Sequence, residues 1–223
     1  MRACCSTPSC GDERSFSRAS TVSPTSRSKL AKPLRRVRLF LAINLEPDLR
    51  RVIHDATSPL RDAAPSMTWV REPQLHLTLK FFGEQPPEVA DRVTEAMTGV
   101  ASRHKHVPIT IGGVGAFPNL RRPRIVWMGI EQSPRLELLH HDVELACEAA
   151  GFDIDARPFR PHLTLARSKG RSNADELRAL ARAARRTTEE VESVVESIDL
   201  MASELSSNGS TYRMVSASRL RSD

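Results

Sequence analysis

The chain has 223 residues, of which 39% are hydrophobic, and a formal net charge of +6. This length suits one domain or two small lobes, and no segment approaches the roughly 20 consecutive apolar residues of a membrane span. The charge is uneven: residues 1–38 hold nine Lys and Arg against two acids, and residues 39–223 hold 24 against 25. The net positive charge therefore belongs to the N-terminal segment, and any basic groove in the remainder must come from local placement of side chains.

Residues 1–36 are rich in Ser, Arg and Pro and poor in large apolar residues, which is typical of disorder. We expect an N-terminal extension without packed structure, followed by one domain over 37–223. Cys4, Cys5 and Cys10 lie in this extension without a nearby His, which argues against a zinc site, and Cys147 is expected to be buried in a helix. This use of cysteine indicates a reducing compartment, and we expect a cytoplasmic protein.

Beyond residue 36 the hydrophobic pattern predicts alternating strands and helices. The run VRLFLAINL from Val37 is continuous and contains β-branched and aromatic residues, as in a buried strand. The other expected elements are a helix over 46–63, a strand over 75–82, a helix after Pro86-Pro87, strands over 107–117 and 124–131, a helix from Ser133-Pro134 to Gly151, a strand over 161–167, a helix from Asn173 to about Arg186, and strands near 194–202 and 211–217. The order forms two similar halves, which predicts a pseudo-twofold α+β architecture.

Local signals support these boundaries. Apolar residues recur at helical spacing in two of the expected helices. They are Val89, Val93, Met97 and Val100 in one helix, and Leu136, Leu139, Val143 and Cys147 in the other. Asn173 with Glu176 three residues later predicts a capping box, and Ser207-Asn208-Gly209 predicts a turn between the last two strands.

The tetrapeptide HLTL occurs at residues 76–79 and again at 162–165. In a chain this rich in leucine the repeat alone is weak support for a function. Alternate side chains of a strand share a face, however, so each copy presents one imidazole and one hydroxyl together. The two copies therefore offer a pair of matched His-x-Thr units.

Two motif strands lying side by side would place His76 and His162 on opposite sides of a cleft, with Thr78 and Thr164 on its floor. A neutral and a protonated imidazole could act as base and acid on one phosphorus. Threonine hydroxyls can donate to phosphate oxygens without adding a charge. This chemistry requires no metal, and neither His has a second ligand at metal-binding spacing on its own strand.

Simpler interpretations remain open for each of these residues. Each motif His could fill an ordinary strand position with its nitrogens satisfied by neighbours. His140-His141 is expected on a solvated helix surface, and Gly112-Gly113-Val114-Gly115 at a strand end, because no Lys-Ser/Thr follows as in a phosphate loop. Arg121, Arg122 and Arg124 suit RNA phosphates or a solvated turn equally well. Phe40 and Phe82 suit the core or a stacked base.

Residues 37–220 resemble the two-histidine (2H) phosphoesterases, in particular the bacterial and archaeal RNA 2′,3′-cyclic phosphodiesterases, also called 2′-5′ RNA ligase-like or LigT-like proteins. The resemblance rests on RLFLAI, LHLTLKFFGE, GAFPNLRRPRIVWMG, GF followed by RPFRPHLTLAR, and LMASEL with Tyr212, in this order. It implies a bilobal α+β sandwich of two antiparallel sheets around a central cleft, with flanking helices and one motif strand from each lobe.

The resemblance also implies a role for each site residue. His162 would accept a proton from the attacking water, and His76 would donate one to the 3′-oxygen, opening a 2′,3′-cyclic phosphate to a 2′-phosphate. Thr78 and Thr164 would hold the phosphate. Arg167 would help to bind substrate, although strict alternation puts it opposite His162, so that this role requires the strand to end or twist there.

The implied substrates are RNA with 2′,3′-cyclic phosphate ends, tRNA fragments among them, or small cyclic nucleotides, and no cofactor is implied. A 5′-hydroxyl in place of water would give a 2′-5′ linkage, with hydrolysis expected to dominate. Two alternatives stay open: an RNA-end-binding protein without turnover, and a cyclic phosphodiesterase for a small metabolite. Because the sequence shows no coiled-coil pattern or aromatic-rich surface stripe, we expect a monomer.

Overall fold

The structure is a computed structural model that describes residues 36–170, 172–206 and 209–222. Leu34–Asp223 form one unit of the chain, and Met1–Pro33 form another. The expected extension, with Cys4, Cys5 and Cys10, lies outside the described residues, as do two of the three expected turn residues near 208. The domain boundary at residue 37 therefore stays a prediction.

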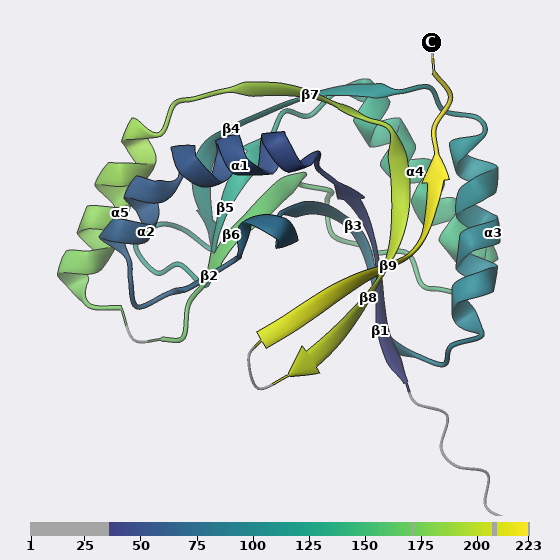
Figure 1. Cartoon of the computed structure of the whole chain (residues 1–223), viewed down its shortest axis with the longest axis horizontal. Coiled ribbons are helices and arrows are strands. Elements are labelled where there is room, and N and C mark those ends of the chain that lie inside the picture. The colour runs from purple at the N-terminus through teal and green to yellow at the C-terminus, as the bar shows by residue number, and fades with distance from the viewer. Residues whose placement is uncertain (1–35, 171, 207–208, 223) are drawn as a thin grey trace, which may run out of the picture. The chain divides into compact units, whose positions relative to one another are not determined.

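The strands of the folded unit form one sheet in which neighbouring strands run antiparallel (Figure 1). They are β1 (Val37–Asn44), β2 (Thr68–Trp69), β3 (His76–Gln85), β4 (Val107–Phe117), β5 (Ile125–Ile130), β6 (His162–Arg167), β7 (Val191–Val195), β8 (Ser197–Ser206) and β9 (Gly209–Arg219). Their order is β7-β4-β5-β6-β3-β1-β8-β9, and β2 pairs with β6. The motif strands β3 and β6 are neighbours at the centre.

Helices flank the two ends of this sheet (Figure 1). They are α1 (Pro47–Ala56), α2 (Ser58–Ala63), the short 3-10 helix η1 (Glu72–Gln74), α3 (Val89–Ala101), α4 (Pro134–Ala149) and α5 (Ala174–Arg186). Helices α3 and α4 pack together near β8 and β9, and α2 packs against α5 near β4. The expected α+β class with antiparallel strands and flanking helices is confirmed.

Two expected elements are each divided in the structure. The single helix expected over 46–63 is two helices, separated at Thr57. Pro59 has no N–H and its ring would clash with the carbonyl of Asp55, so one helix cannot run through this point. The strand expected near 194–202 is likewise two strands, β7 and β8, which pair with different neighbours on either side of Glu196.

The expected residues cap the starts of α4 and α5, and the expected apolar stripes are buried. Ser133 Oγ accepts a hydrogen bond from Leu136 N, and Asn173 Oδ1 accepts one from Glu176 N. The Glu176 carboxylate binds Ser66, so only half of the expected capping box forms. All eight residues of the two apolar stripes are buried. Burial raises the pKa of the Cys147 thiol to about 12, which leaves it protonated and unreactive.

The two halves expected from the sequence meet at a single registered pair, Leu77 opposite Leu163. The two antiparallel sheets are thereby joined into one continuous sheet. Both leucines are fully buried in the main hydrophobic cluster. Among the described residues, no helix has the length and apolarity needed to cross a membrane.

Candidate active site

Both motifs lie on the central strands β3 and β6 with the expected alternation. The histidines and threonines of both copies are partly exposed, whereas Leu77 and Leu163 are buried. Because Leu77 and Leu163 are opposite each other, extending the antiparallel register by one residue sets His76 across from Thr164 and Thr78 across from His162. The fold therefore brings the two His-x-Thr units onto one surface.

The two imidazoles are held in the same way. His76 Nδ1 lies 2.8 Å from the carbonyl oxygen of Gln74, and His162 Nδ1 lies 2.7 Å from that of Arg160. A carbonyl oxygen can only accept, so Nδ1 carries a proton and donates in both cases. In the neutral form this leaves Nε2 as the unprotonated nitrogen, available to a substrate as base, and in the charged form as acid.

Aromatic rings pack around each histidine. The ring of His76 lies 5.2 Å from that of Phe40 and 5.4 Å from that of Tyr212, centroid to centroid. The ring of His162 is edge-on to that of Phe117 at 5.2 Å, and the Trp127 ring lies 6.2 Å away, centroid to centroid. These contacts restrict both imidazole rings. Gly115 on β4 has no space for a Cβ atom because the Trp127 ring occupies that position.

The surroundings of His76 shift its pKa. Burial lowers the pKa of His76 below its usual value. The hydrogen bond to Gln74 opposes this effect, and the positive charges of Arg167 and His162 add to it. Arg167 and His162 are therefore close enough to influence His76, which is more readily neutral than a solvent-exposed histidine.

Arg167 reaches the cleft because strand β6 contains a β-bulge. Thr164 pairs with Trp127 and Ala166 with the adjacent Val126, so Leu165 is an extra residue without a partner. The bulge reverses the alternation: Ala166 points into the core, and Arg167 lines the cleft together with Thr164. The expected role of Arg167 required the strand to end or twist there, and β6 both contains this bulge and ends at Arg167.

The same irregularity in β3 exposes a residue that the sequence pattern did not single out. Ala42 pairs with Thr78 and Leu41 with Lys80, so Leu79 is the extra residue. Lys80 consequently turns inward and is buried, whereas Phe81 is 66% exposed on the cleft face. Phe81 follows Thr78 by three residues, as Arg167 follows Thr164. No feature of the sequence pattern marks the bulge that places it there.

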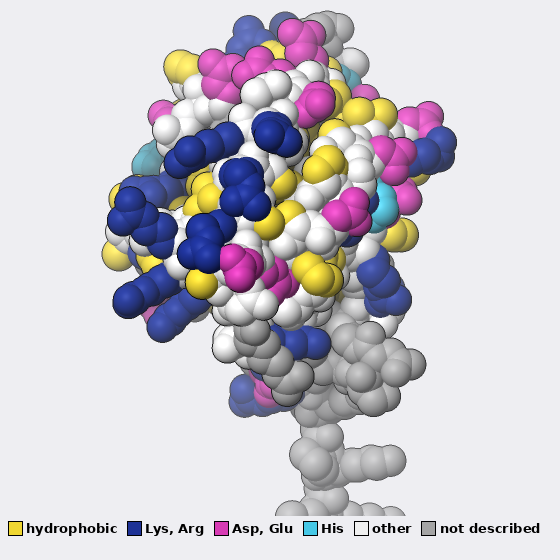
Figure 2. Space-filling model, turned by 90° about the vertical axis from the view of Figure 1, so that its left-hand side faces the viewer, with side chains coloured by type: hydrophobic (Ala, Val, Ile, Leu, Met, Phe, Trp, Pro, Cys, Tyr) yellow, Lys and Arg dark blue, Asp and Glu magenta, His cyan; other side chains and the backbone are white. Residues whose placement is uncertain are grey.

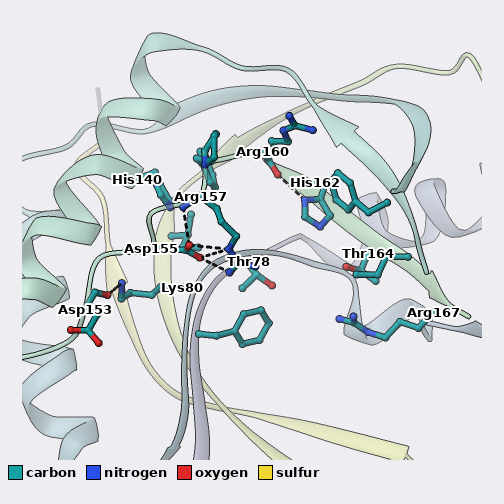
Figure 3. A pocket seen from close by; sticks show the side chains of 16 residues that line it. Thr78, Lys80, His140, Asp153, Asp155, Arg157, Arg160, His162, Thr164 and Arg167 are labelled. Carbon is teal, nitrogen blue, oxygen red and sulfur yellow. Dashed lines mark hydrogen bonds and ion pairs between the residues drawn. The ribbon is translucent and has the colours of Figure 1, made fainter. Parts of the chain in front are cut away.

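Two adjoining cavities open over this surface. One, of about 770 Å³, is lined by His162, and the other, of about 440 Å³, is lined by His76. Four residues line both cavities: Thr78, Phe81, Thr164 and Arg167. Figure 3 shows His162, Thr164 and Arg167 along one side of the larger cavity. A small group bound on the two threonines would thus have one imidazole on each side.

Comparison with known proteins identifies the family of this chain. A family model described as the 2′-5′ RNA ligase superfamily matches residues 45–206. The chain belongs to the 2′-5′ RNA ligase superfamily. Its relatives include a protein of Methanothermobacter thermautotrophicus named RNA 2′,3′-cyclic phosphodiesterase, which is 32% identical over 186 residues, covering 83% of this chain and all of that protein.

Another relative of the same name, from Geobacillus stearothermophilus, is 35% identical over 134 residues, or 60% of this chain. The match spans only 43% of the length of that protein. Among solved structures, the crystal structure of a Thermus thermophilus protein superposes with a TM-score of 0.68 at 28% identity, covering 83% of this chain and 99% of that one. The superfamily fold therefore spans nearly all of the folded unit.

A loop over residues 152–161 forms the far wall of the larger cavity in this superfamily member. The ammonium of Lys80 donates to Glu144 Oε2 at 2.6 Å and to the carbonyl oxygen of Asp153 at 2.7 Å. The same carboxylate oxygen accepts from Asp155 N at 3.0 Å. Arg157 forms an ion pair with Asp155 and holds the pKa of that carboxyl well below its usual range. The buried Lys80–Glu144 pair thus anchors the loop.

The expectation of a solvated surface is wrong for His140 and holds for its neighbour His141, which is exposed. The ring of His140 stacks on that of Phe159 with centroids 3.8 Å apart and lines the larger cavity. This contact joins α4 to the 152–161 loop, so the pattern of residues along the helix alone does not reveal it. Burial lowers the pKa of His140.

Of the remaining candidates, Phe40 lines the smaller cavity, and the others lie apart from both cavities. Gly112–Gly115 lie within strand β4 and not at its end, where they were expected. Asn119 Oδ1 accepts from the backbone N–H groups of Arg121 and Arg122, which form an exposed turn. Phe82 packs against Phe152 in the core, whereas Phe40 supports His76. In the part of the chain that the structure describes, no group of three or more His, Cys, Asp or Glu side chains is arranged to hold a metal ion.

Proposed function

We propose that the cleft hydrolyses 2′,3′-cyclic phosphate ends of RNA to 2′-phosphomonoesters. The observation that supports this most strongly is the matched pair His76 and His162, each with Nδ1 bound to a backbone carbonyl and Nε2 available beside the shared threonines. The names of the superfamily relatives from Methanothermobacter and Geobacillus agree with the same reaction.

In the proposed reaction, His162 Nε2 accepts a proton from water as the water oxygen attacks phosphorus. The bond from phosphorus to the 3′-oxygen breaks on the opposite side, and His76 Nε2 donates a proton to that oxygen. The product keeps phosphate on the 2′-oxygen, with a free 3′-hydroxyl. Each histidine ends in the protonation state in which the other began, so exchange with solvent restores the starting pair.

Thr78 and Thr164 are positioned to donate hydrogen bonds to the non-bridging phosphate oxygens, because they line both cavities between the histidines. Arg167 adds a positive charge where negative charge develops on those oxygens in the transition state. We assign it to substrate binding on the basis of its position after the β6 bulge.

His76 as the acid is compatible with its lowered pKa. The lowering comes from burial and from two neighbouring cationic groups, which disfavour imidazolium. A cyclic phosphate brings a negative charge between the histidines, which favours the protonated form of His76. Substrate binding would therefore raise the pKa of His76 toward the working pH. A proton held loosely in this way is also transferred readily to a departing oxygen.

The smaller cavity is the proposed site of the terminal ribose and base. The 3′-oxygen leaves on the His76 side, so the ribose that carries it must lie on that side as well. The aromatic faces of Phe81 and Tyr212 are available there for a base. The attacking water enters from the larger, His162-lined cavity, and a 5′-hydroxyl of RNA entering by the same path would give the 2′-5′ linkage.

Substrates within this proposal are RNA ends, including tRNA fragments, and small cyclic nucleotides. We propose that the protein works as a monomer and, because Cys147 is buried and forms no disulfide, in the reducing cytoplasm. An RNA-binding protein without turnover would use the same cleft, but it would form no product. A metabolite phosphodiesterase differs in its preference among cyclic phosphates.

The test is incubation of a short RNA ending in a 2′,3′-cyclic phosphate with the protein in EDTA, with 2′- and 3′-phosphate products resolved. The proposal predicts the 2′-phosphate alone, at a rate unaffected by the chelator. Binding of the RNA without product would favour the binding protein. Turnover of a non-nucleotide cyclic phosphate that is faster than turnover of both RNA 2′,3′-cyclic phosphate ends and cyclic nucleotides would favour the metabolite enzyme.

A further inference from the structure

Helix α5 concentrates positive charge on a surface outside the proposed catalytic cleft. Its segment 178–186 contains four arginines and no acidic residue, although residues 39–223 as a whole have slightly more acids than bases. All four arginines are exposed: Arg178, Arg182, Arg185 and Arg186. We call this set the α5 arginine surface. Figure 2, which looks onto the side of the molecule that carries α5, shows Lys and Arg side chains gathered over it.

Most of this charge has no partner within the fold. Arg178 pairs with Asp175 at 2.5 Å. Within the described ranges, no ion pair joins Arg182, Arg185 or Arg186 to another residue. Arginines in the last turn stabilise a helix through its dipole, which accounts for Arg185 and Arg186. The dipole effect fades within one turn of the helix end, so it does not account for Arg182.

Two of the arginines converge on a groove. Arg182 and Arg186 are one turn apart on the same face and line a hollow of about 410 Å³, whose floor includes Pro59 and Ala183. Glu189 also lines this groove and would oppose a bound anion. Four of its eight lining residues are alanine or proline, so little side-chain bulk separates the two arginines from a phosphate of an extended backbone.

The surface is connected to the cleft through β6. This strand ends at Arg167 in the cleft, and α5 begins seven residues later. The start of α5 is held in place because the Glu176 carboxylate accepts hydrogen bonds from Ser66 N and Oγ at 2.7 and 2.8 Å. Ser66 is close in sequence to Thr68, which pairs with Arg167 in the sheet. From this start, α5 extends for about 20 Å, and its arginines lie along that length.

We propose that the α5 arginine surface binds backbone phosphates of an RNA whose end occupies the cleft. This proposal rests on the proposed function, and it assigns a second contact region that small cyclic nucleotides do not reach. Arg182 and Arg186 contact phosphates in the groove, and the other two arginines extend the positive path. The contacts are with phosphate and are independent of sequence. They distinguish a long RNA from a mononucleotide with the same cyclic end.

The test compares kcat/KM for 2′,3′-cyclic AMP and for a 20-nucleotide RNA with a 2′,3′-cyclic phosphate, from low to high salt. For Arg182→Gln/Arg186→Gln we expect kcat/KM on the RNA to fall about three- to tenfold at low salt, and the salt slope to shrink by about 0.7 per arginine. Turnover of cyclic AMP should not change. Glutamine keeps a good helix propensity, so α5 should remain folded.

A matched control is Arg135→Gln/Arg219→Gln, which removes two exposed charges from α4 and β9, at the other end of the strand order. It should leave both substrates nearly unaffected. Glu189→Gln should have the opposite effect to the α5 double variant and improve kcat/KM on the RNA. Equal losses in the control and the α5 variant, or no loss in the α5 variant, would overturn the proposal.

Failure of the proposed function would give a different result. If the wild type turns over neither substrate, fluorescence anisotropy with the same RNA still tests the α5 arginine surface. The proposal predicts that the α5 variant binds the RNA more weakly, and with less salt dependence, than the control variant does. Equal binding of the RNA by both variants would then reject the surface separately from the chemistry.

Discussion

Leu77 and Leu163 lie opposite each other in the pair that joins β3 to β6, and each is the second residue of its His-x-Thr motif. An antiparallel pair of equivalent residues relates the two strands by a local twofold rotation. The rotation sets each histidine across from the other motif's threonine, so the duplicated motif forms a single site. Within this site, burial and the positive charge of Arg167 lower the pKa of His76.

The first prediction concerns the pKa of His76. Burial lowers this pKa and the charge of Arg167 adds to the effect, so His76 should lose its proton below about pH 6.5, the usual value for histidine. Arg167→Gln removes one cause and should raise the pKa of His76. NMR titration of the imidazole protons, assigned with His76→Ala, measures both values. An unshifted His76 in wild type, or no rise in Arg167→Gln, would refute this electrostatic assignment.

The same shift fixes the sign of a stability effect. Between the lowered pKa of His76 and about 6.5, the unfolded chain binds more protons at this residue than the folded chain does. His76 therefore contributes stability above pH 6.5 that is lost as the pH falls through this window. Urea unfolding of wild type and His76→Gln at pH 7.5 and pH 5.5 should show a smaller pH dependence in the variant.

The second prediction separates the acid from the base. A phosphodiester with a 4-nitrophenolate leaving group needs little protonation of that group. His76→Ala should therefore retain most of the wild-type rate on this compound, whereas His162→Ala should lose about 100- to 10,000-fold on it, as on RNA. Spectrophotometric release of nitrophenolate gives both rates. The reverse pattern would exchange the two roles and leave the site in place.

The third prediction concerns the buried pair Lys80 and Glu144, which anchors the loop over residues 152–161. Glu144→Leu alone leaves a buried, uncompensated ammonium and should cost about 3–5 kcal/mol of unfolding free energy. Lys80→Met/Glu144→Leu removes both charges, so most of that loss should be recovered. Urea denaturation of the two variants measures the difference. If the double variant is no more stable than the single one, the loop contacts rather than the charge dominate.

The motif faces could be predicted from the sequence because alternation in a strand is a local property. His76, Thr78, His162 and Thr164 share one surface as the pattern requires. The roles proposed for them stay predictions until activity is measured. Apolar stripes such as that of α3 were equally readable, since burial repeats with the helical period.

The bulges could not be predicted, because one unpaired residue leaves the composition of a strand unchanged. The extra Leu165 is what brings Arg167 into the cleft, and the extra Leu79 exposes Phe81 and buries Lys80. Each of these outcomes depends on pairing with a strand distant in sequence. The stacking of His140 on Phe159 could not be predicted either, because it is a tertiary contact between a helix and a loop.

The most direct test of the paired-histidine account uses RNA with a 2′,3′-cyclic phosphate end and three single variants. Wild type and His141→Ala, which changes an exposed helix residue, should both give the 2′-phosphate. His76→Ala and His162→Ala should remain folded by circular dichroism and each give no detectable 2′-phosphate. Formation of 2′-phosphate at the wild-type rate by either of these two variants would contradict the account.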